Sequence, residues 1–342
     1  MEQKTKADRN FGGHFISGFF KWAAVALVVG AVGGVVGTLF YSLVNGAADF
    51  RARYPFMLYF LPLFGLLIAH LYRINGMSDN GGTNQVISSV RDKNHPPVVI
   101  APLIFVSTAL TNLGGGSAGR EGASLQLGGS IGSAVGKLFR FDEKDMSVVV
   151  MCGMSSVFSA VFGTPLTAAV FTLEVISVGQ IYYASLLPCL GSSLAAYGIS
   201  ISLGAVPERF YGVKVADFNL PSVLRVALLG VLCALLSMVF CIVMKRSSKL
   251  IKSFIKNVYV RILAGSAAVI LLTLICGSQK YNGTGMSLVE SAVMHGNAQP
   301  WDFALKLLFT AISLGVGFRG GEIVPAFAVG ATFGCVFGGF LG

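Results

Sequence analysis

The stretch Asn112–Gly129, NLGGGSAGREGASLQLGG, places an arginine and a glutamate among glycines and other small residues. Long apolar runs flank it on both sides, Val98–Leu113 before it and Val148–Phe162 after it. Charged side chains are costly inside a membrane, and those that occur there usually serve a function. Arg120 and Glu121 are therefore the first candidates for a functional site.

The composition around this stretch is that of a membrane protein. Of 342 residues, 54% are hydrophobic and 12% are charged, about half the charged fraction of a typical soluble domain. Several apolar runs approach the ~20 residues that cross a bilayer, and others are shorter. The polar, basic opening followed by a long apolar run does not resemble a cleavable signal peptide. The sequence predicts an all-α, polytopic protein embedded in the lipid bilayer.

The net charge of +10 admits two explanations, membrane topology or nucleic-acid binding. Topology is favoured because the basic residues cluster at two places, before the first apolar run and in what we expect to be a loop after Met244. Under the positive-inside rule these places are cytoplasmic. We expect an inner-membrane protein with a cytoplasmic N-terminus and no nucleic-acid partner. The clustered residues are Lys4, Lys6, Arg9, Lys245, Arg246, Lys249, Lys252, Lys256 and Arg261.

Metal and cofactor chemistry find no support in the sequence. The six cysteines lie in or beside apolar segments without a CxxC pair, which is typical of packing thiols. The four histidines have no partner three or four positions away, unlike the spacing of helical zinc ligands. We therefore expect no metal site and no cofactor.

The chain is expected to form two membrane halves. They are residues 19–205 and 221–342, preceded by an N-terminal segment, 1–18, and separated by a polar connector, 206–220. Expected helices fall near 19–45, 56–73, 84–92, 97–113, 121–139, 145–162, 165–178, 181–204, 221–246, 258–277, 301–316 and 322–341.

The halves share a motif that indicates an internal repeat. A shift of 201 positions superimposes GGGSAGREGASLQLGG on GVGFRGGEIVPAFAVG and pairs Glu121 with Glu322. Short apolar segments that begin at Gly or Pro are typical of helices starting partway through a membrane and pointing their N-termini at a central site. Such an N-terminus binds anions through unpaired N–H groups, and glycines allow close approach.

Three helix starts of this kind are expected to line an anion path. They are NGGTNQVI, GREGAS and GGEIVP, where backbone N–H groups and the Asn84 amide would replace the water that a strongly hydrated anion loses. The candidate anion-binding residues are Gly81, Gly82, Thr83, Asn84, Gly119, Arg120, Gly122, Ile323 and Val324.

Two glutamates lie at these starts and are candidate proton carriers. Ionised Glu121 would occupy the anion position itself and leave it when protonated, which makes it a candidate gate. Glu322 is the second candidate for proton transfer. The alternative is that Glu121 only caps a helix, with Arg120 as its ion-pair partner. Glu174, near the end of its segment, would face an aqueous vestibule or a partner.

At these residues the chain resembles the CLC family of anion channels and proton-coupled anion transporters. GREGAS resembles the family motif GREGP, GGEIVPAFAVGA resembles GGxFxP, PLTAAVFTLEV resembles the segment after the central helix pair, and NGGTNQVI resembles a degenerate GSGIP. The resemblance implies a homodimer with one pore per subunit and Glu121 as the gating glutamate. Family members continue through further helices after the position of Gly342, with a pore-lining tyrosine and part of the dimer interface.

Three departures from the common pattern resemble the fluoride/proton antiporter branch. The first motif lacks the serine and the proline that chloride-selective members carry. Val175 stands at the position where chloride/proton exchangers have their internal proton-transfer glutamate. Glu322 stands where typical members have an aliphatic or aromatic residue. Two positions depart from that branch as well. Gly82 or Thr83 stands where the branch has a methionine, and Val324 where it has a threonine.

The resemblance leads to one expected function and leaves two alternatives. We expect export of fluoride in exchange for protons. A chloride channel or chloride/proton exchanger of the same family is the first alternative. An intramembrane enzyme with Glu121 and Glu322 as paired carboxylates is the distant one, for which the sequence offers no nucleophile, metal cluster or cofactor loop.

Overall fold

The computed structural model describes residues 2–78, 81–92, 95–176, 182–205 and 219–341, with side chains from residue 18 to residue 340 of these ranges. These residues form α-helices and one short 3-10 helix, and the described part contains no strand, only one isolated bridge. Within it, seven helices are long and apolar enough to cross a membrane. The all-α, polytopic fold class is confirmed.

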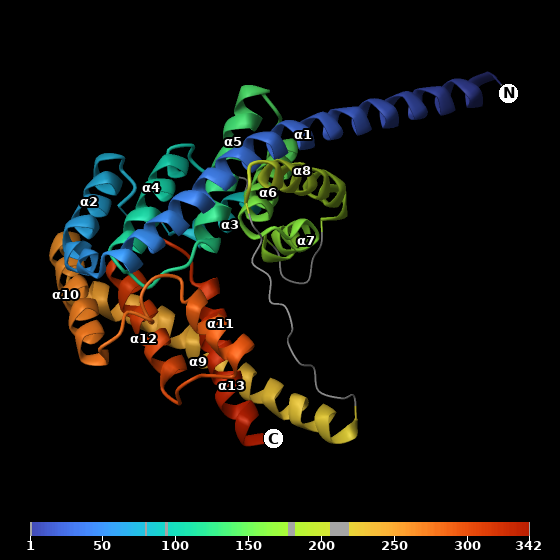
Figure 1. The fold of residues 1–342 in the computed structure, drawn as a ribbon. Helices are drawn as coiled ribbons and strands as arrows, with labels where there is room; N and C mark the ends of the chain where they lie inside the picture. Colours follow the sequence, from blue (N-terminus) through green and yellow to red (C-terminus); the bar gives the residue numbers. More distant parts are fainter. Residues whose placement is uncertain (1, 79–80, 93–94, 177–181, 206–218, 342) are drawn as a thin grey trace. The chain divides into compact units, whose positions relative to one another are not determined.

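Figure 1 shows the helices in chain order, coloured from blue to red. Their bounds are α1 Glu2–Arg53, η1 Pro55–Phe60, α2 Leu61–Ile74, α3 Thr83–Arg91, α4 Ile100–Leu113, α5 Glu121–Leu138, α6 Glu143–Phe162, α7 Pro165–Ile176, α8 Tyr183–Ser202, α9 Leu220–Phe254, α10 Val258–Cys276, α11 Met286–His295, α12 Asp302–Val316 and α13 Ile323–Leu341.

The chain divides into two compact units that interleave along the sequence. Unit 1 comprises residues 1–42, 83–101 and 124–208, and unit 2 comprises residues 43–82, 102–123 and 209–342. The expected halves, 19–205 and 221–342, remain a prediction.

Unit 1 is built around α6, most of whose residues are buried. Asp142 caps its start by accepting a hydrogen bond from the Asp145 N–H, and Gly163, at a φ of 68°, ends it in the left-handed conformation. Small polar side chains join α6 to α8, where the hydroxyls of Ser155 and Ser192 lie 3.1 Å apart. Such small residues let membrane helices approach closely.

Unit 2 contains the glycine runs of both motifs and the helix starts that follow them. Here α12 packs against α9, α10 and α13, and α2 packs against α10. Phe240, Leu307 and Val329 form a small buried apolar cluster among α9, α12 and α13. Most of α9 is exposed and strongly apolar, as expected for a surface in contact with lipid.

A polar anchor fixes the start of α12 in unit 2. The Tyr281 hydroxyl donates to Asp302 Oδ1 at 2.5 Å, Lys280 Nζ lies 2.8 Å from the same oxygen, and the Gln299 N–H donates to Oδ2 at 2.9 Å. Burial raises the pKa of Asp302, whereas these hydrogen bonds together lower it by more. The pKa of this carboxyl therefore lies below its usual range.

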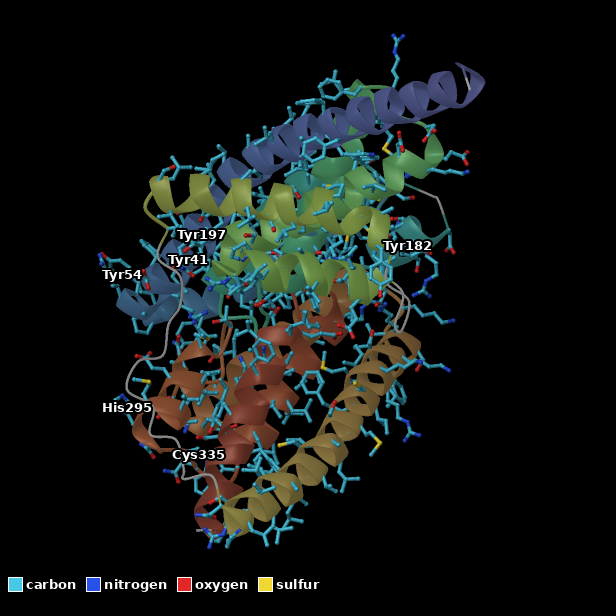
Figure 2. The ribbon with its side chains drawn as sticks, turned by 90° about the vertical axis from the view of Figure 1, so that its right-hand side faces the viewer. Tyr41, Tyr54, Tyr182, Tyr197, His295 and Cys335 are labelled. Atoms are coloured by element: carbon cyan, nitrogen blue, oxygen red, sulfur yellow. The ribbon has the colours of Figure 1, made fainter. Side chains whose placement is uncertain are left out.

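Three expectations about helix extent were wrong. The first helix begins at Glu2 rather than near residue 19, so residues 2–18 belong to α1. Most of the basic residues after Met244 are not in a loop, because α9 continues to Phe254 and carries four of them, α10 carries Arg261, and only Lys256 lies in the connection between the two helices. A helix was also missed: α11 lies between α10 and α12 and ends at His295 (Figure 2).

The cysteines fit the expectation of packing thiols only in part, because Cys241 is exposed. All six are free thiols on α6, α8, α9, α10 and α13, with Cys335 on α13 (Figure 2). Cys152 and Cys189 are fully buried in unit 1.

Candidate functional site

Two of the expected helix starts lie side by side in unit 2. Gly119, before α5, and Gly321, before α13, form an antiparallel bridge in which each N–H donates to the other carbonyl at 2.7 Å. The bridge brings the N-termini of α5 and α13 together. The expectation of converging helix starts therefore holds for these two.

The bridge also corrects the alignment of the repeat. In the structure Gly119 faces Gly321, and α5 begins at Glu121 where α13 begins at Ile323. These pairs differ by 202 positions, not by the 201 that the glycine pattern suggests. By local structure, Glu322 therefore corresponds to Arg120 rather than to Glu121.

The Glu121 carboxylate lies at the N-terminus of α13. Glu121 is only 1% exposed, its Oε2 accepts a hydrogen bond from the Val324 N–H at 3.1 Å, and its Oε1 accepts one from the Arg120 N–H at 3.2 Å. A helix N-terminus stabilises negative charge. The carboxylate thus occupies a position suited to a small anion, between two helix starts.

Two glycines make room for this carboxylate. A Cβ atom on Gly119 would lie 2.2 Å from Glu121 Oε2, and one on Gly321 would lie 2.9 Å from the same oxygen. Both distances are shorter than real Cβ contacts, so a side chain at either position would push against the carboxylate, and one at Gly321 would also lie 2.5 Å from the Gly122 backbone nitrogen. The glycines of the motif are therefore needed for close approach at this site.

The neighbouring Arg120 turns to α1. Its guanidinium Nη1 donates a hydrogen bond to Asn45 Oδ1, and the side chain is 3% exposed. This contact ties the loop before α5 to the end of α1. Asn45 is a residue that the sequence analysis missed, because nothing in the run SLVNGAAD distinguishes it.

A fully buried lysine lies behind the same loop. Lys306, on α12, is 0% exposed and its Nζ donates to Ser117 Oγ at 2.9 Å, Tyr281 O at 3.0 Å and Gly283 O at 2.8 Å. Ser117 precedes the Gly119 bridge, so Lys306 fixes the approach to Glu121. The sequence analysis missed it, although a lysine inside the apolar run FALKLLFTAIS is a usable signal.

The other residues of the α13 start differ in exposure. Val324 is 5% exposed and supplies the N–H that Glu121 accepts, Ile323 is partly buried, and Glu322 is exposed. The carboxylates of Glu121 and Glu322 therefore occupy different environments. They do not form the buried pair that a two-carboxylate enzyme would require.

The first expected start, Gly81–Asn84, is divided between the units. Gly82 has a φ of 65°, a left-handed conformation that favours glycine, and α3 begins at the next residue, Thr83. Gly81 and Gly82 belong to unit 2, whereas Thr83 and Asn84 belong to unit 1. That this start joins the other two remains a prediction.

Together, these features define a class of protein: a helical membrane protein with a buried carboxylate between two glycine-flanked helix starts. The comparisons give the family. The sequence profile described as "Voltage gated chloride channel" matches residues 64–342. A "Chloride/fluoride channel protein" of Pseudomonas syringae is 32% identical over 92% of this chain and 71% of its own length.

Solved structures and other relatives agree with this assignment. A crystal structure of a CLC-type fluoride/proton antiporter has a TM-score of 0.89 and 30% identity, covering 94% of this chain and 82% of that one. An H⁺/Cl⁻ exchange transporter of Vibrio cholerae is 24% identical over 92% of this chain and 72% of its own. The chain belongs to the CLC family of anion channels and transporters.

Proposed function

We propose that this protein exports fluoride in exchange for protons and that Glu121 is both the gate and the proton carrier. The observation that carries the proposal is the position of the Glu121 carboxylate, which accepts the Val324 N–H at the N-terminus of α13. A permeant anion requires the same donor. Carboxylate and anion therefore compete for one position.

Protonation decides this competition. An ionised Glu121 is attracted to the helix N-terminus, whereas a neutral carboxylic acid loses most of that attraction and releases the N–H groups. An anion then enters from one side as the proton leaves on the other. This alternation couples anion movement to proton movement.

The remaining proposed roles follow the sequence analysis. Backbone N–H groups at Gly81, Gly82 and Gly122 and at the α13 start, Ile323 and Val324, would replace the water of a strongly hydrated anion, assisted by Thr83, Asn84 and Arg120. Gly119, whose N–H is engaged in the bridge to Gly321, would contribute by allowing close approach. Glu322, exposed beside the α13 start, is the second proton-transfer group. Val175 stands where a conventional exchanger has its internal glutamate, so protons require another route.

The choice of fluoride is supported by two relatives. The Pseudomonas syringae protein carries both chloride and fluoride in its name, and the antiporter structure with 30% identity is of the fluoride/proton type. Chloride/proton exchange is the second candidate, because Val324 and Gly82 or Thr83 depart from the fluoride branch. We further propose a homodimer in the inner membrane with a cytoplasmic N-terminus.

The test is efflux from liposomes that contain the full gene product and are loaded with fluoride or chloride, with the external pH recorded. Fluoride efflux that drives proton uptake supports the proposal. Glu121→Gln should abolish proton movement, whereas Glu174→Gln, a change of an exposed carboxylate on α7, should leave it unchanged. Chloride efflux without fluoride preference would assign the second candidate, and proton coupling that survives Glu121→Gln would remove Glu121 from the mechanism.

A further inference from the structure

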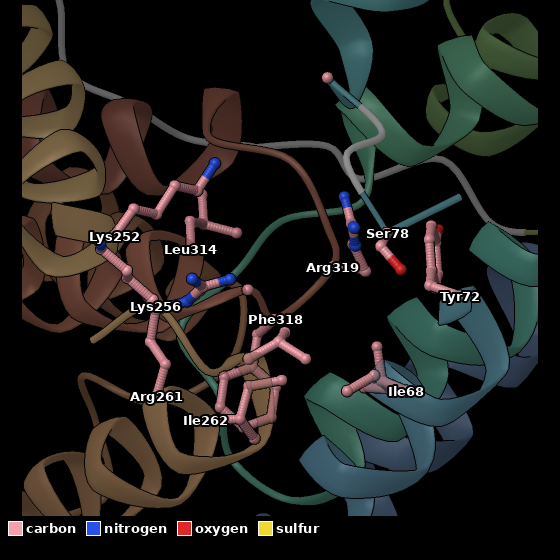
Figure 3. A pocket seen from close by; sticks show the side chains of 14 residues that line it. Ile68, Tyr72, Ser78, Lys252, Lys256, Arg261, Ile262, Leu314, Phe318 and Arg319 are labelled. Carbon is pink, nitrogen blue, oxygen red and sulfur yellow. The ribbon is translucent and has the colours of Figure 1, made fainter. Parts of the chain in front are cut away.

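A second feature of unit 2 is a strongly basic cavity of about 360 Å³ (Figure 3). Four of its lining residues are cationic: Lys252, Lys256, Arg261 and Arg319. None of the described lining residues is acidic. The cavity therefore gathers positive charge that no carboxylate in its wall offsets.

The two arginines are held in place by the protein. Arg261, on α10, donates from Nε to Val316 O at 3.1 Å and from Nη1 to Ile255 O at 3.3 Å. The Arg319 guanidinium lies 4.0 Å from the centre of the Tyr72 ring, a cation–π arrangement. Both cations are thus positioned before any ligand arrives, which lowers the entropic cost of binding.

The two lysines are exposed and add two further positive charges to the wall of the cavity. Lys252 lies in the last turn of α9, and Lys256 lies between α9 and α10. Figure 3 shows Lys252, Lys256 and Arg261 on one side of the cavity and Arg319, Ser78 and Tyr72 on the other. A ligand in the cavity would have cations on two opposite sides.

Size and chemistry define the ligand class. A volume of about 360 Å³ lies within the range of small-molecule sites, roughly 300–1,000 Å³, and is far larger than a monatomic ion needs. Guanidinium groups match the geometry of phosphate oxygens, and lysines add point charges. Basic pockets between membrane helices on the cytoplasmic side are also sites for anionic lipid headgroups.

We propose that this cavity binds a phosphate group, carried by a soluble phosphate compound or by the headgroup of an anionic phospholipid. Its position gives the bound ligand an effect on transport. Gly81 lines the cavity, as do Gly317, Phe318 and Arg319, which lead along the chain to the α13 start. A ligand held there obstructs the anion path. This effect on transport rests on the proposed function, whereas the binding itself does not.

The binding test uses inorganic pyrophosphate and the full gene product in a neutral detergent at low salt, followed by calorimetry. Lys252→Gln/Lys256→Gln should weaken pyrophosphate binding at least tenfold, and added salt should weaken it in the unmodified protein. The matched control is Lys245→Gln/Lys249→Gln, which removes the same charge from exposed positions of α9 that do not line the cavity. Equal losses in both double variants would overturn the proposal, as would no pyrophosphate binding together with no effect of anionic lipid.

The transport test separates the two sources of phosphate. Fluoride efflux is measured in vesicles of phosphatidylcholine, with pyrophosphate on the cytoplasmic face or with cardiolipin in the membrane. Inhibition by pyrophosphate alone assigns a soluble ligand, and inhibition by cardiolipin alone assigns a lipid headgroup; both should vanish in the Lys252/Lys256 double variant. Fluoride efflux that neither pyrophosphate nor cardiolipin changes would overturn the proposed obstruction of the anion path. Vesicles without either ligand test the proposed function itself, so the two failures remain distinguishable.

Discussion

Gly119, at the bridge between α5 and α13, permits a direct test of the proposed gate. Gly119 does not have a positive φ, so alanine is compatible with its backbone conformation. The new Cβ would lie 2.2 Å from Glu121 Oε2 and 2.9 Å from Pro325 Cδ. The carboxylate oxygen must therefore move by about 1 Å to reach an ordinary contact distance.

The magnitude follows from the hydrogen bond that this movement breaks. Oε2 accepts the Val324 N–H at 3.1 Å, and a displacement of about 1 Å lengthens that bond beyond hydrogen-bond range. A hydrogen bond to a charged group contributes about 1.5–3 kcal/mol, which shifts the equilibrium between seated and displaced carboxylate by about ten- to a hundredfold. A displaced carboxylate no longer excludes the anion.

The assay is liposome efflux with simultaneous recording of anion and protons. We expect Gly119→Ala to transport more anion per proton than the unmodified protein and to approach the behaviour of Glu121→Gln. Gly334→Ala is the matched control, because a Cβ at that position of α13 meets open space. A folded Gly119→Ala protein that keeps the unmodified ratio of anion to proton would refute the reasoning.

Three further predictions concern stability, measured as thermal unfolding of the purified protein in detergent. Lys306→Met leaves two carbonyl groups and the Ser117 hydroxyl without their buried donor and should destabilise the fold by about 2–5 kcal/mol; an unchanged melting temperature would contradict this account. Because the pKa of Asp302 is lowered by folding, its stabilising effect is present above about pH 4 and lost as the pH falls further. Asp302→Asn should therefore be less stable at neutral pH and less sensitive to acid, and a parallel acid response would show that other groups dominate. Gly153→Ala would place a Cβ 2.1 Å from the Gly128 carbonyl oxygen and should cost about 1–3 kcal/mol, whereas Gly230→Ala, which meets open space, should cost less than half of that.

The fold class and the starts of the motif helices could be predicted because they depend on local patterns. Apolar runs report burial in lipid, and a glycine run followed by an apolar segment reports a helix start. Glu121 begins α5 as the motif indicates, and Pro165 begins α7. Proline in a first turn and glycine before a start depend on backbone geometry alone.

Other features could not be predicted from the sequence because tertiary contacts determine them. α11, Met286–His295, is short and mixes polar with apolar residues, so its sequence alone gives a weak helix signal. The basic segment after Met244 continues α9 because lysine and arginine favour helices, and charge marks topology rather than a helix end. The register of the two motifs shifts by one residue because the bridge pairs Gly119 with Gly321, a choice that counting glycines cannot make.

Only part of the candidate site could be predicted from the sequence, because tertiary contacts determine the rest. The carboxylate and its glycines belong to one motif, whereas Asn45, Lys306 and the cavity arginines come from distant segments of the chain. Arg319 reads from the sequence as part of the glycine motif, yet in the structure it stacks on Tyr72 of α2.

The bridge between Gly119 and Gly321 has a consequence for speed. Two reciprocal hydrogen bonds of 2.7 Å hold the ends of α5 and α13 together, so separating them would require a collective helix motion, which takes microseconds to milliseconds. Rotation of one glutamate side chain needs no such motion and belongs to a much faster class of movement. With the helix ends held together, the gate opening that we propose for Glu121 needs only that rotation. The proposed mechanism then predicts that turnover is set by the arrival of protons and anions and not by motion of the helices.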